Sequence, residues 1–267
     1  MQRSVREQRV TAEEQAGEEK WDKDAAESRG IWGKYQSKWP QEESPPVDRS
    51  DDPPGTWYGD RDRRLEPADN SQVEAACDRI AKCEEEKISP RMRAVESQDS
   101  NRHLIGFEHC RKGRDRIKEK VYDFKTEKGH SLEKAVSLVP DAIRYTFQYR
   151  ESRYAQGVWA DIERLKAQGF GLRKVKNYWS DEEYKGINTQ WIHPESGQRF
   201  EVQFHTRISF EAKQLTHDAY ERLRAQPDDE LEKLVLKAFQ GKVSAEIPVP
   251  PGAHGIPDYT WRGTDAR

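Results

Sequence analysis

Apolar and polar residues alternate most regularly in the segment 200–206, Phe-Glu-Val-Gln-Phe-His-Thr. Because successive side chains of a β-strand point to opposite faces, Phe200, Val202 and Phe204 are predicted to enter a core. The polar residues would form a row on the opposite face. A carboxylate, an amide and an imidazole in one row are more typical of the floor of a site than of a plain solvated strand. That row consists of Glu201, Gln203 and His205.

Neighbouring segments continue the strand pattern. Ile187–Ile192 and Arg199–Thr206 are predicted to form a hairpin, because the segment His193–Gly197 between them contains the Pro and Gly of a turn. Another strand is expected at Leu172–Trp179. The β-rich run Asp141–Phe147 begins with an acid, which suggests a second functional side chain at a strand end.

Helical periodicity dominates elsewhere. Asn70-Ser71 can cap a helix with one apolar stripe. The stripe is Val73, Ala76, Ile80 and either Cys83 or Ala81. Further helices are expected from Ser89-Pro90 and over 104–128, 131–136, 157–168, 207–224 and 231–239. This order of elements predicts an α+β fold at residues 67–240, a mixed β-sheet flanked by helices.

The two ends of the chain have a different composition. Residues 1–60 carry 9 Lys/Arg against 14 Asp/Glu, and four of the eight tryptophans lie before residue 67. We interpret residues 1–66 as a disordered or partly helical acidic tail, with a linker at Pro40–Gly55. Its tryptophans could also dock onto a partner or back onto the domain. Residues 241–267 are expected to be a loose Pro/Gly-rich tail.

Composition and motifs restrict the expected cellular location and exclude several kinds of catalytic site. The chain has 36% charged residues, three cysteines, no apolar run long enough to span a membrane and no visible signal peptide. A reducing, cytoplasmic location without membrane contact is expected, with non-classical export left open. No Gly-rich phosphate loop, hydrolase triad or zinc spacing is present.

Positive charge gathers in residues 102–125, with 8 Lys/Arg against 4 Asp/Glu. On the expected helix, Lys112, Arg116 and Lys120 are four residues apart and would share one face, as suits a polyphosphate. A solvated charged face is the alternative. Asp141 and Glu201 would supply the one or two carboxylates that Mg²⁺ takes beside substrate phosphate oxygens. Together these groups favour metal-assisted phosphoryl or pyrophosphoryl transfer.

With these motifs, the segment from about Leu104 to Leu223 resembles the synthetase domain of RelA/SpoT-type nucleotide pyrophosphokinases. Actinomycete ATP nucleotide 3′-pyrophosphokinases and RelA/SpoT-like toxins are close to the same pattern. The family's ATP-binding helix reads R-x-K-S-x-x-S-x-x-x-K. Lys112 and Lys120 fall on its lysines, Arg116 on a serine and Cys110 on the first arginine. The resemblance implies ATP phosphate binding by this segment.

Two strands of the family pattern also recur. The family's D-x-x-G-x-R is similar to Asp141–Thr146, with Arg144 in place of the glycine. Its E-[IV]-Q-[IL]-R-T is similar to Glu201–Thr206, with His205 in place of the arginine. The resemblance implies that Asp141 and Glu201 are the catalytic, Mg²⁺-binding residues. Glu201 could also act as the general base.

The acceptor side departs further from the family. Its G-Y-x-S-x-H resembles the segment at Tyr184, whose ring would stack on the acceptor base, with Asn188 at the histidine position. A following helix resembles A-E-x-x-x-x-x-H, with Lys213 in place of the acid. The expected substrate-binding set is Lys112, Arg116, Lys120, Arg144, Lys176, Tyr184, Asn188, Gln203, His205 and His217.

These features predict an enzyme that moves the β,γ-pyrophosphate of ATP to the 3′-OH of a purine nucleotide. It would produce (p)ppGpp- or (p)ppApp-like molecules as an alarmone synthetase or a toxin, and a regulator or antitoxin protein is a candidate partner. Pyrophosphorylation of tRNA 3′ ends is the weaker alternative, because nucleic-acid binders usually carry a larger basic surface. A non-catalytic nucleotide-binding module is the alternative from another class.

Overall fold

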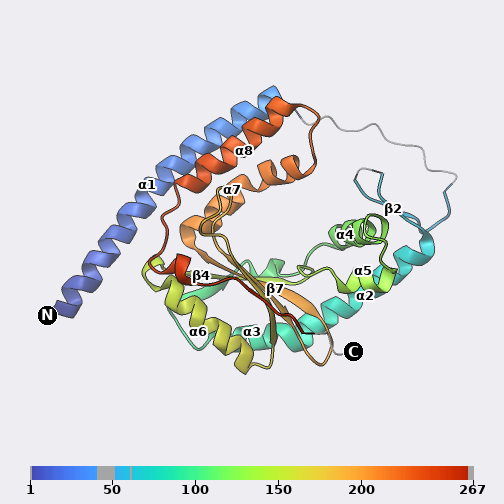
Figure 1. The fold of residues 1–267 in the computed structure, drawn as a ribbon, viewed down its shortest axis with the longest axis horizontal. Helices are drawn as coiled ribbons and strands as arrows, with labels where there is room; N and C mark the ends of the chain where they lie inside the picture. Colours follow the sequence, from blue (N-terminus) through green and yellow to red (C-terminus); the bar gives the residue numbers. More distant parts are fainter. Residues whose placement is uncertain (1, 41–51, 61, 264–267) are drawn as a thin grey trace.

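A mixed six-stranded sheet forms the centre of the molecule in the computed structural model, which describes residues 2–40, 52–60 and 62–263 (Figure 1). The strands lie in the order β3-β4-β7-β6-β5-β8. Only β4 and β7 pair in parallel, and all other neighbours are antiparallel. The predicted α+β class is therefore confirmed. The strands are β3 (Arg102–Ile105), β4 (Arg144–Tyr149), β5 (Gly171–Asn177), β6 (Ile187–Ile192), β7 (Arg199–Thr206) and β8 (Tyr259–Thr260).

The two faces of β7 separate core from site. Phe200, Val202 and Phe204 are fully buried, as the alternation predicts. Helix α6 (Tyr154–Ala167) lies against this apolar face, and the Tyr154 hydroxyl donates to the backbone oxygen of Phe204 at 2.7 Å. Burial of each such aromatic side chain stabilises the fold by about 1.5–3 kcal/mol. The opposite face of β7 carries the polar row.

Helix positions agree with the sequence except at several ends. Helix α2 (Pro67–Cys83) has Glu66 at its N-cap position, so Asn70 and Ser71 lie inside it rather than capping it. Its predicted stripe at Val73, Ala76, Ile80 and Cys83 is buried. A π-helical turn (Glu84–Ile88) connects it to α3 (Ser89–Glu96). The remaining core helices are α5 (Leu132–Ser137), α7 (Arg207–Arg224) and α8 (Glu230–Ala245).

The helix expected over 104–128 is the largest correction. Residues Arg102–Ile105 form strand β3 instead, a short 3₁₀ turn follows, and α4 begins only at Arg114 (Arg114–Thr126). Gly113 is the N-cap residue with extended backbone. Lys112 therefore precedes the helix, and the expected i, i+4, i+8 ridge does not form.

The described part of the N-terminal segment contains a helix that contacts the domain, as a partly helical tail with docking tryptophans would. Helix α1 (Gln2–Lys38) runs beside α7 and α8 (Figure 1). Trp21 is buried and its indole N–H donates to Glu211 at 2.8 Å, while the Trp32 ring stacks on Phe239. Of the expected linker at Pro40–Gly55, residues 41–51 lie outside the described residues. A small hairpin, β1 (Trp57–Tyr58) with β2 (Arg64–Leu65), precedes α2.

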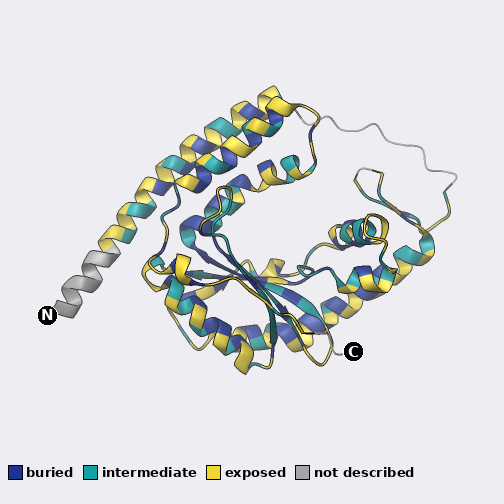
Figure 2. Ribbon diagram, in the orientation of Figure 1, coloured by how far each residue is buried: buried dark blue, intermediate teal, exposed yellow. Residues whose placement is uncertain are grey.

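The C-terminal segment contributes to the sheet. Helix α8 extends to Ala245, six residues beyond the end that the sequence predicts. Strand β8 pairs with β5, and Ala253 and Ile256 are buried. Figure 2 shows most of the central sheet in the colours of buried and intermediate residues. Residues 241–263 are therefore packed rather than loose. Among the described residues, no helix combines the length and apolarity that crossing a membrane requires.

Candidate active site

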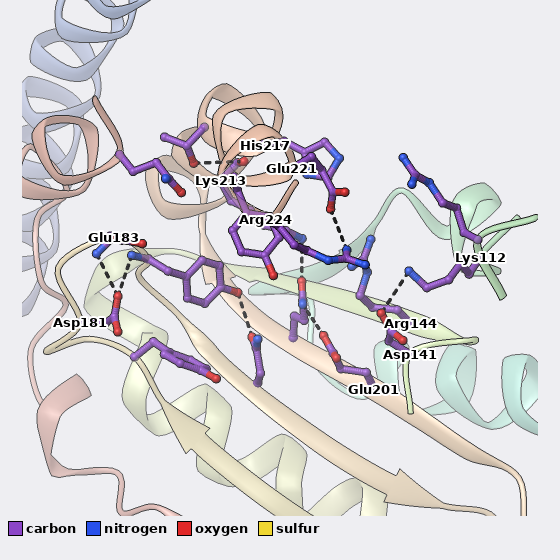
Figure 3. Close-up of a pocket in the computed structure, with 18 of the residues that line it drawn as sticks. Lys112, Asp141, Arg144, Asp181, Glu183, Glu201, Lys213, His217, Glu221 and Arg224 are labelled. Atoms are coloured by element: carbon purple, nitrogen blue, oxygen red, sulfur yellow. Dashed lines mark hydrogen bonds and ion pairs between the residues drawn. The ribbon is translucent and has the colours of Figure 1, made fainter. Parts of the chain in front are cut away.

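A pocket of about 540 Å³ opens above the polar face of β7, between α4 and α7 (Figure 3). This volume lies within the usual range for small-molecule sites. The fold brings ten of the twelve expected site residues to its wall from six separate segments. They are Lys112, Arg116, Lys120, Asp141, Arg144, Tyr184, Asn188, Glu201, Gln203 and His217.

Asp141 lies between two lysines. Its carboxylate oxygens are 3.1 Å from Nζ of Lys112 and 2.7 Å from Nζ of Lys120. Burial alone would raise the pKa of Asp141, but the two ammonium groups outweigh it and the pKa is lowered. We call this group the Asp141 cluster. It keeps Asp141 ionised and holds two cations at the pocket wall.

Backbone pairing explains how Lys112 reaches Asp141 without being helical. The Lys112 N–H donates to the oxygen of Ala142 at 2.9 Å, and the Arg144 N–H donates to the oxygen of Cys110 at 2.7 Å. The segment before α4 therefore lies antiparallel to the segment before β4. Burial lowers the pKa of Lys112, while Asp141 opposes this shift.

The other two expected cations are disposed differently. Arg116 on α4 pairs with Glu119 at 2.9 Å and remains about half exposed. Arg144 is aligned with Glu201 in the β4–β7 register and lines the same pocket. Among the described residues, the Arg144 side chain makes no hydrogen bond or ion pair, and its charge acts on Glu201, so its guanidinium can bind a ligand.

Glu201 lies beside the Asp141 cluster on the neighbouring strand β7, where its backbone N–H donates to the oxygen of Ile143 at 2.9 Å (Figure 3). Burial raises its pKa, and the negative charge of Asp141 adds to the shift, whereas Arg144, Gln203 and Lys213 oppose it. Gln203 donates its amide N–H to the Glu201 carboxylate and accepts from Nζ of Lys213 at 2.7 Å. Because the Lys213 ammonium can only donate, the amide oxygen of Gln203 must face Lys213, and the amide NH₂ group must face Glu201.

Lys213 replaces the acid of the family pattern and lines the same pocket (Figure 3). Burial lowers its pKa to about 7, and repulsion by Arg144 and Lys112 adds to the effect, against the attraction of Glu201. A half-buried amine near its titration point can bind an anionic ligand in its charged form.

Tyr184 lies at the β5–β6 side of the pocket and is held by its hydroxyl. The hydroxyl donates to Oδ1 of Asn188 at 2.8 Å. The Nε2 of His205 lies 2.9 Å from the Tyr184 hydroxyl oxygen, whose proton is already donated to Asn188. Nε2 must therefore carry a proton and donate it to the Tyr184 oxygen. Nδ1 of His205 then accepts from the Ser209 hydroxyl at 2.9 Å. These bonds hold the Tyr184 hydroxyl in place.

Two expected binding residues lie outside the pocket. His205 is fully buried under Gly186, where a Cβ would come within 2.7 Å of the ring, so it supports Tyr184 and cannot contact substrate. Its pKa is well below the usual value because of burial, with Lys213 and Arg144 adding to the shift. Lys176 bonds Asp258 of the C-terminal segment at 2.7 Å. Strand alternation predicted the face of both residues but not what covers that face.

Helix α7 contributes residues that the sequence interpretation missed. Thr216, Tyr220, Glu221 and Arg224 line the pocket together with His217. Their spacing of three and four residues places them on one helical face. That polar periodicity was the available signal. Tyr178, Glu119 and Gln240 also line the pocket without a sequence indication.

The carboxylates are suited to a small hard cation. Asp141 and Glu201 face one pocket, and repulsion by Asp141 adds to the burial that raises the pKa of Glu201. A cation between them would relieve that repulsion. Among residues 2–40, 52–60 and 62–263, no group of three His, Cys, Asp or Glu is placed to hold a metal ion. The remaining ligands would have to come from substrate and water, as is usual for Mg²⁺.

No protein-family model and no curated protein matches the chain. Among solved structures it is similar to small alarmone synthetase 1 from Bacillus subtilis bound to its product pppGpp, with 16% identity and a TM-score of 0.49 over 66% of this chain and 92% of that chain. It is also similar to smu.1046c from Streptococcus mutans UA159, with 14% identity and a TM-score of 0.45 over 66% and 90%. A GTP pyrophosphokinase family protein from Streptococcus pneumoniae has 12% identity and a TM-score of 0.43 over 68% and 92%.

Proposed function

We propose that the chain transfers the β,γ-pyrophosphate of ATP to the 3′-OH of a purine nucleotide. The main support for the proposal is one pocket in which two lysines converge on Asp141 while the half-buried Glu201 lies on the neighbouring strand. Phosphate oxygens can replace Asp141 as partners of Lys112 and Lys120. The released Asp141 would then be free to share a cation with Glu201.

The reaction needs positioning and charge neutralisation. The 3′-OH oxygen forms a bond to the β-phosphorus, the bond from that phosphorus to the oxygen bridging to the α-phosphorus breaks, and AMP leaves with this oxygen. Glu201 takes the 3′-OH proton, a role that its raised pKa suits. Lys112, Lys120 and Arg144 stabilise the charge on the transferred group.

Asp141 and Glu201 are the residues that would hold Mg²⁺, which when bound would neutralise phosphate charge. Tyr184, with its hydroxyl held by Asn188 and His205, would stack on the acceptor base. Base–aromatic stacking contributes about 1–3 kcal/mol, enough to fix a nucleotide's position. The product would be a (p)ppGpp- or (p)ppApp-like nucleotide, made as an alarmone or as a toxic end product.

The test is direct. The protein is incubated with ATP and Mg²⁺ together with GDP, GTP, ADP or AMP in separate reactions, and the nucleotides are separated by anion-exchange chromatography. A 3′-pyrophosphorylated acceptor formed in equal amount with AMP is expected. Labelling of tRNA without any nucleotide product would point to the tRNA reaction instead. Nucleotide binding without any product would contradict the enzyme and favour a binding module.

A further inference from the structure

The mouth of the pocket, between α4 and α7, carries an aromatic side chain that the proposed chemistry leaves unused. Tyr220 on α7 has 51% of its surface exposed and lines the pocket. Trp159 on α6 is similarly exposed, at 45%, but lies outside the pocket. A large exposed ring on a pocket wall has apolar area to gain from a ligand.

Two guanidinium groups accompany this ring at the mouth. Arg224 follows Tyr220 by four residues on α7, and Arg116 faces it from α4. Each arginine is held by a carboxylate three residues away on its own helix: Arg116 by Glu119 at 2.9 Å and Arg224 by Glu221 at 3.3 Å. The pKa of Arg116 is raised, first by Glu119 and also by Glu221, which shows that α7 faces α4 here.

Planar guanidinium groups stack on aromatic rings because they are weakly hydrated across their faces. The ion pairs to Glu119 and Glu221 hold the edges of the two guanidinium groups and leave their faces available. The mouth of the pocket is therefore lined by one phenol ring, Tyr220, and two planar cations, Arg116 and Arg224. A flat heteroaromatic ring is the ligand part that such a set of surfaces fits best.

We propose that Tyr220, together with Arg116 and Arg224, binds the nucleobase of the pyrophosphate donor. This inference rests on the proposed function. The donor is favoured over the acceptor because Arg116 lies one turn before Lys120, which belongs to the Asp141 cluster, on the same helix. Tyr184 is near Glu201, whose charge contributes to raising the pKa of the Tyr184 phenol after burial. The two aromatic rings thus come from different elements, Tyr184 from the connection between β5 and β6 and Tyr220 from α7.

The test compares a ligand that has a base with one that has none. Binding of ATP and of inorganic tripolyphosphate, each with Mg²⁺, is measured by calorimetry for the full chain and for Tyr220→Ala, Tyr220→Phe and the control Trp159→Ala. Tyr220→Ala is expected to weaken ATP binding about tenfold or more and to leave tripolyphosphate binding unchanged. Tyr220→Phe keeps the ring and should bind ATP within about threefold of the original protein.

Several outcomes would overturn the inference. They are equal loss of ATP and tripolyphosphate binding in Tyr220→Ala, no loss of either, or an original protein that binds ATP no more tightly than tripolyphosphate. In the transfer assay, a rise in the KM of the acceptor alone would assign the ring to the acceptor and also overturn it. If ATP binding depends on Tyr220 while no acceptor receives pyrophosphate, the base site stands and the proposed reaction fails.

Discussion

The two neighbouring carboxylates of the pocket are held in opposite ways. Asp141 is neutralised by two lysines, and its pKa is lowered despite burial. Glu201 has an amide as its hydrogen-bonding partner, and its pKa is raised by burial and by Asp141. In the proposed reaction, the first arrangement suits a carboxylate whose lysines pass to phosphate oxygens, and the second suits a carboxylate that accepts a proton. Substitutions at these residues and around them test this contrast.

Removal of the Glu201 charge should have the largest effect on activity. Glu201→Gln is expected to lower the transfer rate by roughly a hundredfold to ten-thousandfold, because the general base is lost. The free energy of unfolding should stay equal or rise, since a buried charge disappears. Chromatography of the products and chemical denaturation measure the two effects. The control is Glu195→Gln, an exposed acid in the turn of the same hairpin. Retained activity in Glu201→Gln would refute the assignment.

Removal of the Asp141 charge should affect both activity and stability. Asp141→Asn leaves Lys112 and Lys120 facing each other without an anion. We expect transfer to be lost and the free energy of unfolding to fall by about 1–3 kcal/mol, because a largely buried ion pair is broken. Urea denaturation checks the second effect, with the exposed Glu133→Gln as control. Equal changes in the free energy of unfolding for Asp141→Asn and Glu201→Gln would contradict the different settings of the two carboxylates.

The acceptor side should respond more weakly. Tyr184→Ala is expected to raise the KM of the acceptor about tenfold and that of ATP much less, because the stacking surface is lost. Tyr184→Phe keeps the ring but loses the bonds to Asn188 and His205, so an intermediate rise is expected. Steady-state kinetics with each substrate varied in turn give both values. Equal rises for the two substrates would argue against stacking.

The smallest effect is the pH dependence of stability due to Lys213. Its pKa is about 7 in the folded protein and about 10.4 in an unfolded chain. Between these values the unfolded chain binds more protons, so this residue makes stability rise with pH. Lys213→Met should therefore raise the free energy of unfolding by about 1–3 kcal/mol at pH 6, a gain that shrinks toward pH 10.

Urea denaturation between pH 6 and pH 10 measures this difference. Lys166→Met changes an exposed lysine on α6 and should show no such trend. A difference between Lys213→Met and the original protein that is independent of pH would contradict the lowered pKa.

The alternation or periodicity of apolar residues predicted those elements that have one clearly apolar face. Strands β6 and β7 and helix α7 have the predicted bounds, because each alternates or repeats cleanly between core and solvent. Strand β3 was missed because its first residue, Arg102, is a buried cation. Its charge is balanced by Asp161 on α6, 2.7 Å away and 59 residues later. A partner so distant in the sequence cannot be found from the residues around Arg102.

The site was predictable in residue type more than in arrangement. The expected helical ridge of Lys112, Arg116 and Lys120 does not exist, yet Lys112 and Lys120 still meet at Asp141 through backbone pairing between distant segments. Strand alternation put His205 on the polar face, but Tyr184 and Gly186 cover it there. Coverage depends on which loop packs over a strand, and alternation carries no such information.

The two faces of β7 and the chemical groups of the site follow from the sequence alone, because side-chain period and residue type are local properties. How the charges pair depends on the tertiary fold. It aligned β4 with β7 in parallel and placed Asp141 near Glu201. It also brought Lys213 from α7 onto Gln203. Burial and charge proximity set each pKa, and both arise only when segments far apart in the chain come together.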